Sequence, residues 1–474
     1  MTDSGIGIAD DSPRYWSYDG EPTLLLGGSS QDNLFQVPGV EHQLDVIANA
    51  GGNYVRNTMS ARNRRESVLR WGAENVWPFE RVGGDEDAEG DEADERVESD
   101  EAGETAGATY DLDRFDDAYW ERFERFLDLT AERDIVVQVE VWATFDYYRE
   151  PWDENPFNPA NNVNYSPSES GLEETVETSP TGAGPDTQPF FWSVPAELDL
   201  GVVRDYQQRF VDRLLAATTQ HDHVLYCLDN ETSVTPEWSA YWSDYLREHT
   251  DERVYVTEML WEEDASHDQH DATVNDPERY DFLEASQNSK HTGQQHYDIA
   301  TTFRERATDP ARPVNNVKIY GTGDGTQIDF TGSEHDAVER FWRNVFAGHA
   351  SSRFHRPPYG IGINARAERM LRSARAVTDA VDPVACEPRN DLLSDRAPDE
   401  AYALADPGRQ YAVYFPRGGS VTLDVADDTR FDVRWYDVEA CQWVDDQPAD
   451  GSPAGGSPVR LDAPYRKQWV AIVD

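Results

Sequence analysis

The sequence is poor in basic residues, and this shortage excludes several classes of protein. It has 41 lysines and arginines against 92 aspartates and glutamates, which gives a formal net charge of −51. A surface of that charge repels nucleic acid and anionic membranes, so we expect neither as a partner. At low salt the charge also destabilises a compact chain, whereas molar salt shortens the screening length to about 3 Å. The composition therefore predicts a protein adapted to a salty cytoplasm.

Cysteine, long apolar runs and phosphate-binding motifs are also scarce. The three cysteines, Cys227, Cys386 and Cys441, lie far apart and lack the close spacings of a disulfide framework or a metal site. No window approaches the ~20 apolar residues of a membrane span, and no basic segment followed by an apolar stretch opens the sequence. No glycine-rich loop follows the first expected strand. We therefore expect a cytoplasmic protein without a metal or a cofactor.

Short apolar runs followed by amphipathic helices repeat along residues 1–388. Such a run is typical of a buried parallel strand, and the helix after it carries the chain back to the start of the next strand. Eight such units predict an α/β fold, a closed (β/α)8 barrel. The expected strands are 22–27, 53–59, 135–142, 223–229, 253–260, 280–285, 313–320 and 352–355. The expected helices are 40–50, 116–133, 202–219, 237–249, 297–307, 336–348 and 366–381.

Two insertions and a second domain depart from this repeat. Residues 85–108 are expected to be disordered, because 12 acidic residues stand between Asp85 and Glu104. Residues 147–198 are rich in asparagine and aromatics, which predicts an ordered lid whose rings stack either on sugars or on each other. Residues 389–474 form short alternating runs separated by turn residues, which predicts a small antiparallel β-sandwich.

Polar residues at the strand ends, and in the loops after them, are the candidate site residues, because the active site of such a barrel lies at the carboxyl ends of its strands. A partly desolvated carboxyl group there suits general acid catalysis, and glycosidic hydrolysis usually needs two carboxyls. The segment VLYCLDNET is the strongest candidate, since an apolar strand ends directly in Asn230 and Glu231. The other candidates are Arg56, Asn57, Glu140, Trp142, Glu258, Glu284, Gln287, Asn288, His296, Lys318, Arg353, His355 and Arg356.

With these features the chain resembles the clan A glycoside hydrolases, and among them the apiosidase-like and cellulase-like barrels. The resemblance rests on LLG in the first strand, on Asn-Glu closing the fourth, and on two C-terminal segments, AYALADPGRQYAVYFPRGG and FDVRWYD. These last two are similar to a terminal domain of the collagen-binding type. The resemblance implies hydrolysis of a glycosidic bond, with Glu231 as general acid/base and Asn230 holding the sugar 2-hydroxyl.

The seventh and eighth strands depart from the clan pattern. The clan places its nucleophilic glutamate at the end of the seventh strand, where this chain reads PVNNVKIYG with Lys318 near that position, and the eighth strand reads SRFHRP where the clan often has a tryptophan platform. Another carboxylate would then partner Glu231, and the candidates in order are Glu284, Glu258 and Glu140. A basic wall could bind an acidic sugar, and its members would be Lys318, Arg353, His355 and Arg356.

Three functions are compatible with these residues, and each predicts a carbohydrate ligand. The main hypothesis is a glycosidase that acts on an oligosaccharide or polysaccharide fragment, acidic sugars included, with Glu231 as proton donor. The second is a glycan-binding protein that uses a hydrolase-like barrel without cleaving its ligand. The third is a lyase in which Lys318 or His355 removes a proton from a uronic acid.

Overall fold

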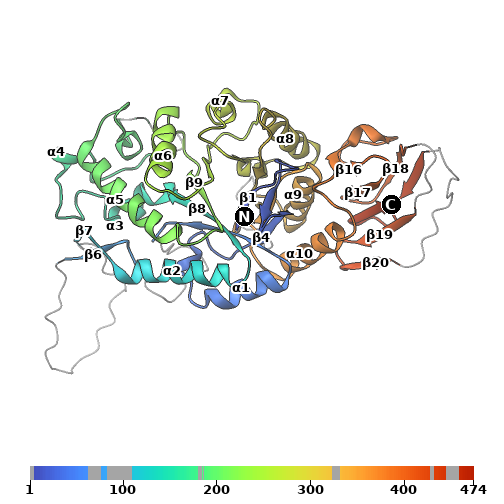
Figure 1. Cartoon of the computed structure of the whole chain (residues 1–474), viewed down its shortest axis with the longest axis horizontal. Coiled ribbons are helices and arrows are strands. Elements are labelled where there is room, and N and C mark those ends of the chain that lie inside the picture. The colour runs from blue at the N-terminus through green and yellow to red at the C-terminus, as the bar shows by residue number, and fades with distance from the viewer. Residues whose placement is uncertain are drawn as a thin grey trace, which may run out of the picture.

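The structure is a computed structural model that describes residues 5–61, 76–82, 109–179, 184, 186–322, 331–426, 432–444 and 458–474. The predicted acidic insertion, 85–108, lies outside the described residues. The described chain forms a barrel and a β-sandwich that lie side by side along the long axis of the molecule (Figure 1). None of the helices in this part of the chain combines the length and apolar character that a membrane crossing requires.

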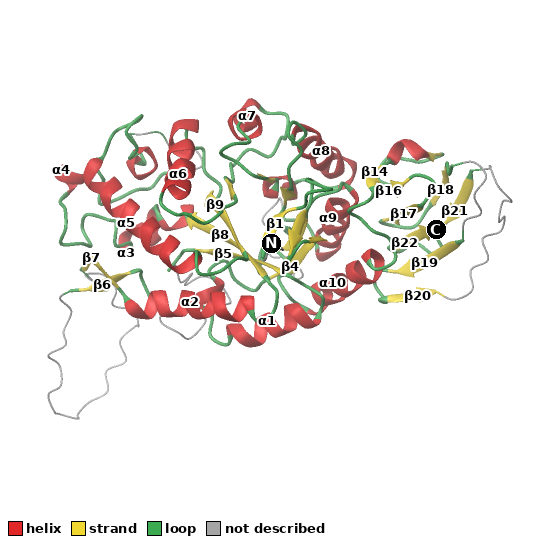
Figure 2. Ribbon diagram, viewed as in Figure 1, coloured by secondary structure: helices red, strands yellow, loops and turns green. Residues whose placement is uncertain are grey.

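Eight parallel strands surround the barrel axis in the described residues. Six of them form one sheet, and the remaining two pair with each other. The Asp281 amide donates to the Val256 carbonyl at 2.9 Å on one side of this pair, and a parallel bridge between Ile319 and Phe354 joins the other side, so the barrel closes. The strands in order of pairing are β10 (Val256–Thr257), β9 (Val224–Asp229), β8 (Val136–Trp142), β5 (Tyr54–Thr58), β4 (Leu25–Gly28), β13 (Ser351–Phe354), β12 (Val314–Asn315) and β11 (Leu283–Glu284). The strands labelled β4, β5, β8 and β9 in Figure 2 lie between the helices.

Amphipathic helices cover the outside of the barrel, so the strands they cover are buried on both faces. Every residue of β5, β8 and β9 is buried. Along β5 the side chains alternate: Arg56 points into the barrel toward Glu140, while Val55 belongs to the apolar core under the helices. The helices are α1 (Val40–Asn49), α2 (Asp117–Ala131), α5 (Gly201–Thr218), α6 (Pro236–Glu248), α7 (Asp271–Asn275), α8 (Gly293–Arg306), α9 (Glu334–Phe346) and α10 (Ala365–Thr378). The predicted (β/α)8 barrel is confirmed.

The first predicted strand, 22–27, is wrong at its start. Residues Glu21–Thr23 form β3, which belongs to an antiparallel sheet with β1 (Ile6–Ile8) and β2 (Trp16–Tyr18), and the barrel strand begins at Leu25. Trp16 of this sheet is fully buried, and its Nε1 donates to Asn315 Oδ1 of β12 at 3.0 Å. The extra sheet therefore packs its tryptophan directly against the barrel.

The fifth, sixth and seventh strands are shorter than the predicted runs, with two residues each in regular pairing. Side chains replace the backbone ladder beyond those residues. The Met259 amide donates to Asp229 Oδ1 at 2.8 Å, and the Val317 amide donates to Ser286 Oγ at 2.8 Å. The apolar runs are buried as predicted, but polar side chains at or just after the ends of neighbouring strands accept the hydrogen bonds that a carbonyl would accept in a ladder.

The insertion 147–198 is ordered in its described residues, and many of its rings pack on one another. It contains α3 (Arg149–Glu154), α4 (Pro167–Ser170) and a short 3-10 helix, η3 (Pro189–Trp192). The rings of Tyr147 and Phe190 stack with centroids 4.1 Å apart. Much of this segment is therefore an extension of the barrel core, as the self-packing interpretation of the sequence expected.

The C-terminal domain is an antiparallel sandwich whose first strand, β14 (Glu387–Pro388), pairs with β16 (Tyr402–Asp406). Its six-stranded sheet also contains β17 (Gln410–Phe415), β19 (Val433–Asp437), β20 (Gln442–Val444) and β22 (Trp469–Val473). Its three-stranded sheet contains β15 (Leu393–Ser394), β18 (Ser420–Leu423) and β21 (Val459–Asp462). The Tyr414 ring stacks on Trp342 of α9 at 5.6 Å, and Asp399 accepts from Arg343 at 2.8 Å. The sandwich thus braces the barrel through α9.

Candidate active site

Glu231 lies two residues beyond the end of β9, in a backbone conformation that is rare for its residue type. The six residues of β9, VLYCLD, are all buried, so the strand directs the next residues to the carboxyl end of the barrel. Glu231 has φ = +64°, and its amide donates to the Met259 carbonyl at 2.9 Å. A non-glycine residue in this region costs about 1–3 kcal/mol and persists only where the surrounding structure holds it. The side chain is therefore held in place at a small cost in stability.

Glu231 forms a buried ion pair with Lys318, which follows β12. Lys318 Nζ donates to Glu231 Oε1 at 2.5 Å and also to Asn230 Oδ1. Tyr320 Oη donates to the same Glu231 oxygen at 3.1 Å. Burial alone would raise the pKa of Glu231, but the charge and hydrogen bond of Lys318, together with the Gln287 amide, lower the pKa to about 2. Glu231 is therefore a carboxylate in the free protein.

A second charged network surrounds Arg56, whose side chain enters the barrel from β5. Its guanidinium donates to both carboxylate oxygens of Glu140, at 2.6 Å for Oε2, and to Asp32 Oδ1 at 2.6 Å. Asp32 Oδ2 accepts from Arg356 Nε at 2.5 Å. Burial acts to lower the pKa of Arg56, but the charges of Glu140 and Asp32 raise it on balance. The two arginines thus hold Asp32 between them.

His355 and Tyr320 add two uncharged polar rings beside these networks. Their rings meet edge to face with centroids 4.9 Å apart. Burial lowers the pKa of His355 well below its ordinary value of 6.5, and burial followed by the charge of Glu231 raises that of Tyr320 well above 10.0. His355 Nδ1 has no hydrogen-bond partner in the described part of the chain. A neutral imidazole and a neutral phenol therefore lie next to the ion pair.

Lys290 and Trp261 form a further pair that sequence reasoning missed. Lys290 ends a 3-10 helix, η5 (Ser286–Lys290), after β11, and its Nζ lies 3.5 Å from the centroid of the Trp261 ring. The side chain of Lys290 is 7 % exposed, whereas Trp261 is 37 % exposed. Burial lowers the pKa of Lys290 below its ordinary value of 10.5. The scarcity of lysine could have drawn attention to Lys290, because the chain has only three lysines.

These groups line one cavity of about 250 Å³. Among the described residues its lining holds four basic side chains and two carboxylates, in a protein whose acidic residues outnumber its basic ones more than two to one. The charge of the cavity wall is therefore opposite in sign to that of the whole molecule. The lining residues are Asp32, Arg56, Phe145, Tyr148, Ser179, Asn230, Glu231, Trp261, Lys290, Lys318, Tyr320, His355, Arg356 and Tyr359.

Six of the predicted site residues lie in this wall, and they come from β5, β9, β12 and β13 or the residues after these strands. They are Arg56, Asn230, Glu231, Lys318, His355 and Arg356. Two more stand directly behind the lining: Glu140 pairs with Arg56, and Gln287 contributes to the low pKa of Glu231. The rule that selects strand ends therefore identified the centre of the cavity.

The predicted partners of Glu231 have other surroundings. Glu258 accepts from Ser239 Oγ of α6 at 2.5 Å and from Thr273 of α7, so it faces the helix layer. Glu284 accepts from Gln138 Nε2 at 3.0 Å inside the barrel. Burial raises the pKa of both carboxyls. Neither is among the described residues that line the cavity, and both are held by neutral partners.

The remaining polar candidates also lie away from the cavity wall. Asn57 follows Arg56 and points to the opposite face of β5, where its Oδ1 accepts from the Phe35 amide at 3.1 Å. Asn288 donates to the carbonyl of His296 at 2.9 Å, and burial lowers the pKa of His296 well below 6.5. Arg353 donates to the Val317 carbonyl at 2.6 Å. These four side chains are not among the described residues of the lining, so the structure does not support them as substrate contacts.

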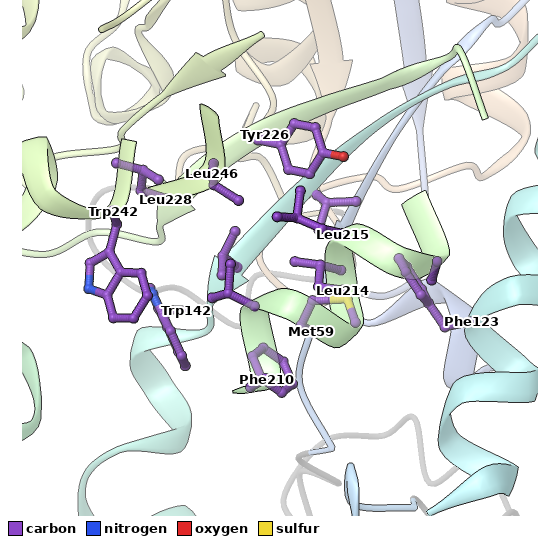
Figure 3. Packing of buried hydrophobic residues seen from close by; sticks show 14 of the residues in the cluster. Met59, Phe123, Trp142, Phe210, Leu214, Leu215, Tyr226, Leu228, Trp242 and Leu246 are labelled. Carbon is purple, nitrogen blue, oxygen red and sulfur yellow. The ribbon is translucent and has the colours of Figure 1, made fainter. Parts of the chain in front are cut away.

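Trp142 was predicted to contact the substrate, but the structure places it in the apolar core and not among the described lining residues. It is fully buried and packs against Phe210 of α5 at 5.4 Å and Trp242 of α6 at 5.2 Å between ring centroids. Figure 3 shows these three rings in the apolar core. An indole enclosed by helix aromatics gains more from burial than from a polar cavity edge. Trp261 is instead the tryptophan of the cavity wall.

Within the described residues no group of three histidine, cysteine, aspartate or glutamate side chains is arranged to hold a metal ion. The cysteines are free thiols, and Cys227 and Cys386 are buried. The cavity wall presents carboxyl, ammonium and guanidinium groups, a neutral imidazole and phenols.

Comparison with solved structures shows the fold. The chain is similar to a glycoside hydrolase family 5 protein from Bacteroides vulgatus, with a TM-score of 0.61 and 12% identity over 99% of this chain and 93% of that one. A second structure, of a glycoside hydrolase, gives a TM-score of 0.60 and 11% identity over 99% of this chain and 96% of that one. No protein-family model matches the chain, and no curated protein matches it.

The similarity covers both domains and shows the fold, a (β/α)8 barrel followed by a β-sandwich. At these identities the fold alone is established. The apiosidase-like subtype and the collagen-binding type of the terminal domain stay predictions. The assignment of function therefore depends on the cavity.

Proposed function

We propose that this protein hydrolyses glycosidic bonds in an oligosaccharide or polysaccharide fragment, with Glu231 as the carboxylate that acts on the bond. The observation that carries the proposal is an ionised, buried carboxylate in a cavity at the carboxyl ends of the barrel strands. Its backbone conformation, with φ = +64°, indicates that the fold holds this side chain at some cost. The structural similarity to glycoside hydrolases favours a carbohydrate ligand over other small molecules.

The ion pair with Lys318 determines when Glu231 can donate a proton. A carboxylate with a pKa near 2 acts as a base or a nucleophile at neutral pH, not as an acid. Burial is the largest influence on this pKa and acts to raise it, so Glu231 would gain a proton more readily once Lys318 moved away. An acidic group of the substrate that offsets the positive charge near Glu231 would act in the same direction. We therefore assign Glu231 the general acid/base role in the substrate complex.

An acidic sugar is the substrate class that fits the charge of the wall. Lys318 and Arg356 present cationic groups, and His355 presents an uncharged ring nitrogen without a hydrogen-bond partner in the described residues. Ammonium and guanidinium groups bind carboxylate or sulfate through charge-assisted hydrogen bonds. Asn230 would contact a sugar hydroxyl beside the reacting carbon, as the clan resemblance implies. The aromatic rings of the wall offer flat apolar surfaces to the sugar faces.

Turnover by a Glu231→Gln variant tests this assignment. We expect its rate on oligosaccharides that the wild type cleaves to fall by about 10² to 10⁴, because general acid–base catalysis contributes that much. Sugar binding should persist, since the amide occupies the same space. Glu258→Gln is the matched control, because that carboxyl is equally buried but faces the helix layer.

A second candidate is a glycan-binding protein that does not cleave its ligand. It is favoured by a specific observation: the two carboxylates among the described lining residues, Asp32 and Glu231, are both engaged by basic side chains. Binding of acidic oligosaccharides without any product would favour this candidate. An unsaturated product that absorbs in the ultraviolet would instead favour a lyase.

A further inference from the structure

We infer that Lys290 is the group that binds the carboxylate of a uronic acid in the cavity and selects such sugars over neutral ones. The inference rests on the proposed function, because it names the substrate class of the same cavity. It assigns the anion to a residue outside the basic wall that the sequence predicted.

The Lys290 ammonium is buried but poorly satisfied. Its Nζ makes no hydrogen bond within the described part of the chain. Its ion pair with Glu263 Oε1 is long, at 3.5 Å, and the other oxygen of Glu263 lies 3.0 Å from His291 Nε2. A buried charge without close hydrogen bonds is unfavourable, so an acceptor entering the cavity would gain free energy by meeting these donors.

Trp261 positions the ammonium without using its hydrogen-bond donors. The Nζ lies 3.5 Å from the ring centroid, within the distance of a favourable cation–π contact. Such a contact attracts the charge to the ring face, and the N–H groups that point away from the ring keep their capacity to donate. Lys290 and Trp261 both line the cavity. The pair is therefore a preformed binding position for an anion.

The distribution of lysine supports a role for this residue type. The chain has three lysines, Lys290, Lys318 and Lys467, against a large majority of arginine among its 41 basic residues. Two of the three line the cavity, and Lys467 pairs with Asp437 in the sandwich. An ammonium is a compact charge that can donate hydrogen bonds in several directions, whereas a guanidinium favours planar, bidentate partners. An ammonium can therefore bind a sugar carboxylate without the planar alignment that a guanidinium requires.

A carboxylate beside Lys290 would also affect Glu231. The positive charge of Lys290 is one of the influences that lower the pKa of Glu231, after those of Lys318 and Gln287. A bound carboxylate would offset that charge, and Glu231 would then take up a proton more readily. Recognition of the acidic sugar and activation of the proton donor are thus linked in one cavity.

The test compares uronates with neutral sugars on the full chain at molar salt. D-glucuronate and D-galacturonate, with D-glucose and D-galactose as matched neutral sugars, are titrated and followed by saturation-transfer NMR. We expect the wild type to prefer the uronates by about tenfold or more. In Lys290→Met we expect uronate affinity to fall by about tenfold to a hundredfold, the loss that follows from removing charged hydrogen bonds, with neutral sugars unaffected. Lys467→Met is the control and should keep the preference.

Several outcomes would overturn the inference. Equal binding of uronates and neutral sugars by the wild type would do so, as would an unchanged uronate preference in Lys290→Met. Inorganic sulfate that competes with the uronates as strongly as they compete with each other would show a site for any anion. If thermal unfolding shows that Lys290→Met does not fold, Lys290→Gln replaces it. The comparison of uronates with neutral sugars on the wild type depends on neither variant.

The result is separable from that of the proposed function. Glu231→Gln could lose turnover while uronate affinity does not depend on Lys290. This result would support the hydrolase function and contradict the role of Lys290. Uronate binding that depends on Lys290, without any turnover by the wild type, would retain the role of Lys290 and remove the hydrolase.

Discussion

Lys318 Nζ lies 2.5 Å from Glu231 Oε1, and this ion pair joins the residues that follow the fourth and seventh strands of the barrel. In the clan that the sequence resembles, two glutamates meet across these strands. Here a carboxylate meets an ammonium, and Asn230 accepts a hydrogen bond from the same Nζ. The pair keeps Glu231 ionised in the free protein, so any proton donation by Glu231 requires the pair to separate.

Lys318→Met should raise the pKa of Glu231 from about 2 to above its ordinary value of 4.5. Burial, the largest influence, acts in that direction, and the substitution removes the charge and the hydrogen bond that oppose it. The carbon-13 chemical shift of the Glu231 carboxyl, followed against pH, measures the change. Lys467→Met, in the sandwich, should leave the titration unchanged. A pKa that stays near 2 in Lys318→Met would show that other groups hold the carboxylate.

The Glu231–Lys318 pair should make a pH-dependent contribution to stability. The folded pKa of Glu231, about 2, lies below its ordinary value of 4.5, so the contribution is present above about pH 4.5 and is lost as the pH falls toward 2. A shift of this size corresponds to about 3 kcal/mol in the free energy of unfolding. Urea unfolding of the wild type and Glu231→Gln should show a stability difference that shrinks over this window. A difference independent of pH would contradict the assignment.

Trp142→Ala and Trp261→Ala should give opposite results. Trp142 is fully buried among the rings of α5 and α6, so its truncation should lower the free energy of unfolding by about 3–5 kcal/mol. Trp261 is partly exposed and supports Lys290 in the cavity, so its truncation should cost little stability but lower uronate affinity about tenfold. Denaturant unfolding and sugar titration measure the two effects. Equal effects of both variants on affinity would place Trp142 in the site.

Stability should rise with salt over a wide range. The formal charge of −51 makes the folded chain repel itself, and added salt screens exposed charges while affecting the buried ion pairs much less. The melting temperature, measured from low to molar potassium chloride, should increase throughout. A melting temperature that is independent of salt would remove the argument for adaptation to a salty cytoplasm.

The sequence predicts the barrel well because its strands and helices have clear periods. The run VLYCLD and the Asn-Glu after it identify β9 and the centre of the cavity. Alternation along a strand could also have excluded Asn57, since its neighbour Arg56 points into the barrel. Glu258 directly follows β10. A shift of one residue in the alternation of side chains decides whether it faces the barrel axis or the helices.

Other features of the site depend on tertiary packing and have no local signal. Asp32 is in the loop after β4 and becomes a site residue through Arg56 and Arg356, which are distant in sequence. Lys290 and Trp261 belong to the segments that follow β11 and β10, and they meet only in the folded barrel. The low pKa of Glu231 also arises from a pairing that a strand-end rule cannot give. That rule takes account of burial alone, which acts to raise the pKa of a carboxyl group.

Product formation by Glu231→Gln decides whether Glu231 acts on a glycosidic bond. Wild type, Glu231→Gln and Glu258→Gln are incubated with the same acidic oligosaccharides, and the products are separated and counted. We expect the wild type and Glu258→Gln to release hydrolysed products, whereas Glu231→Gln should bind the oligosaccharide and release about 10² to 10⁴ times less product. Equal product release by Glu231→Gln and the wild type would contradict this expectation.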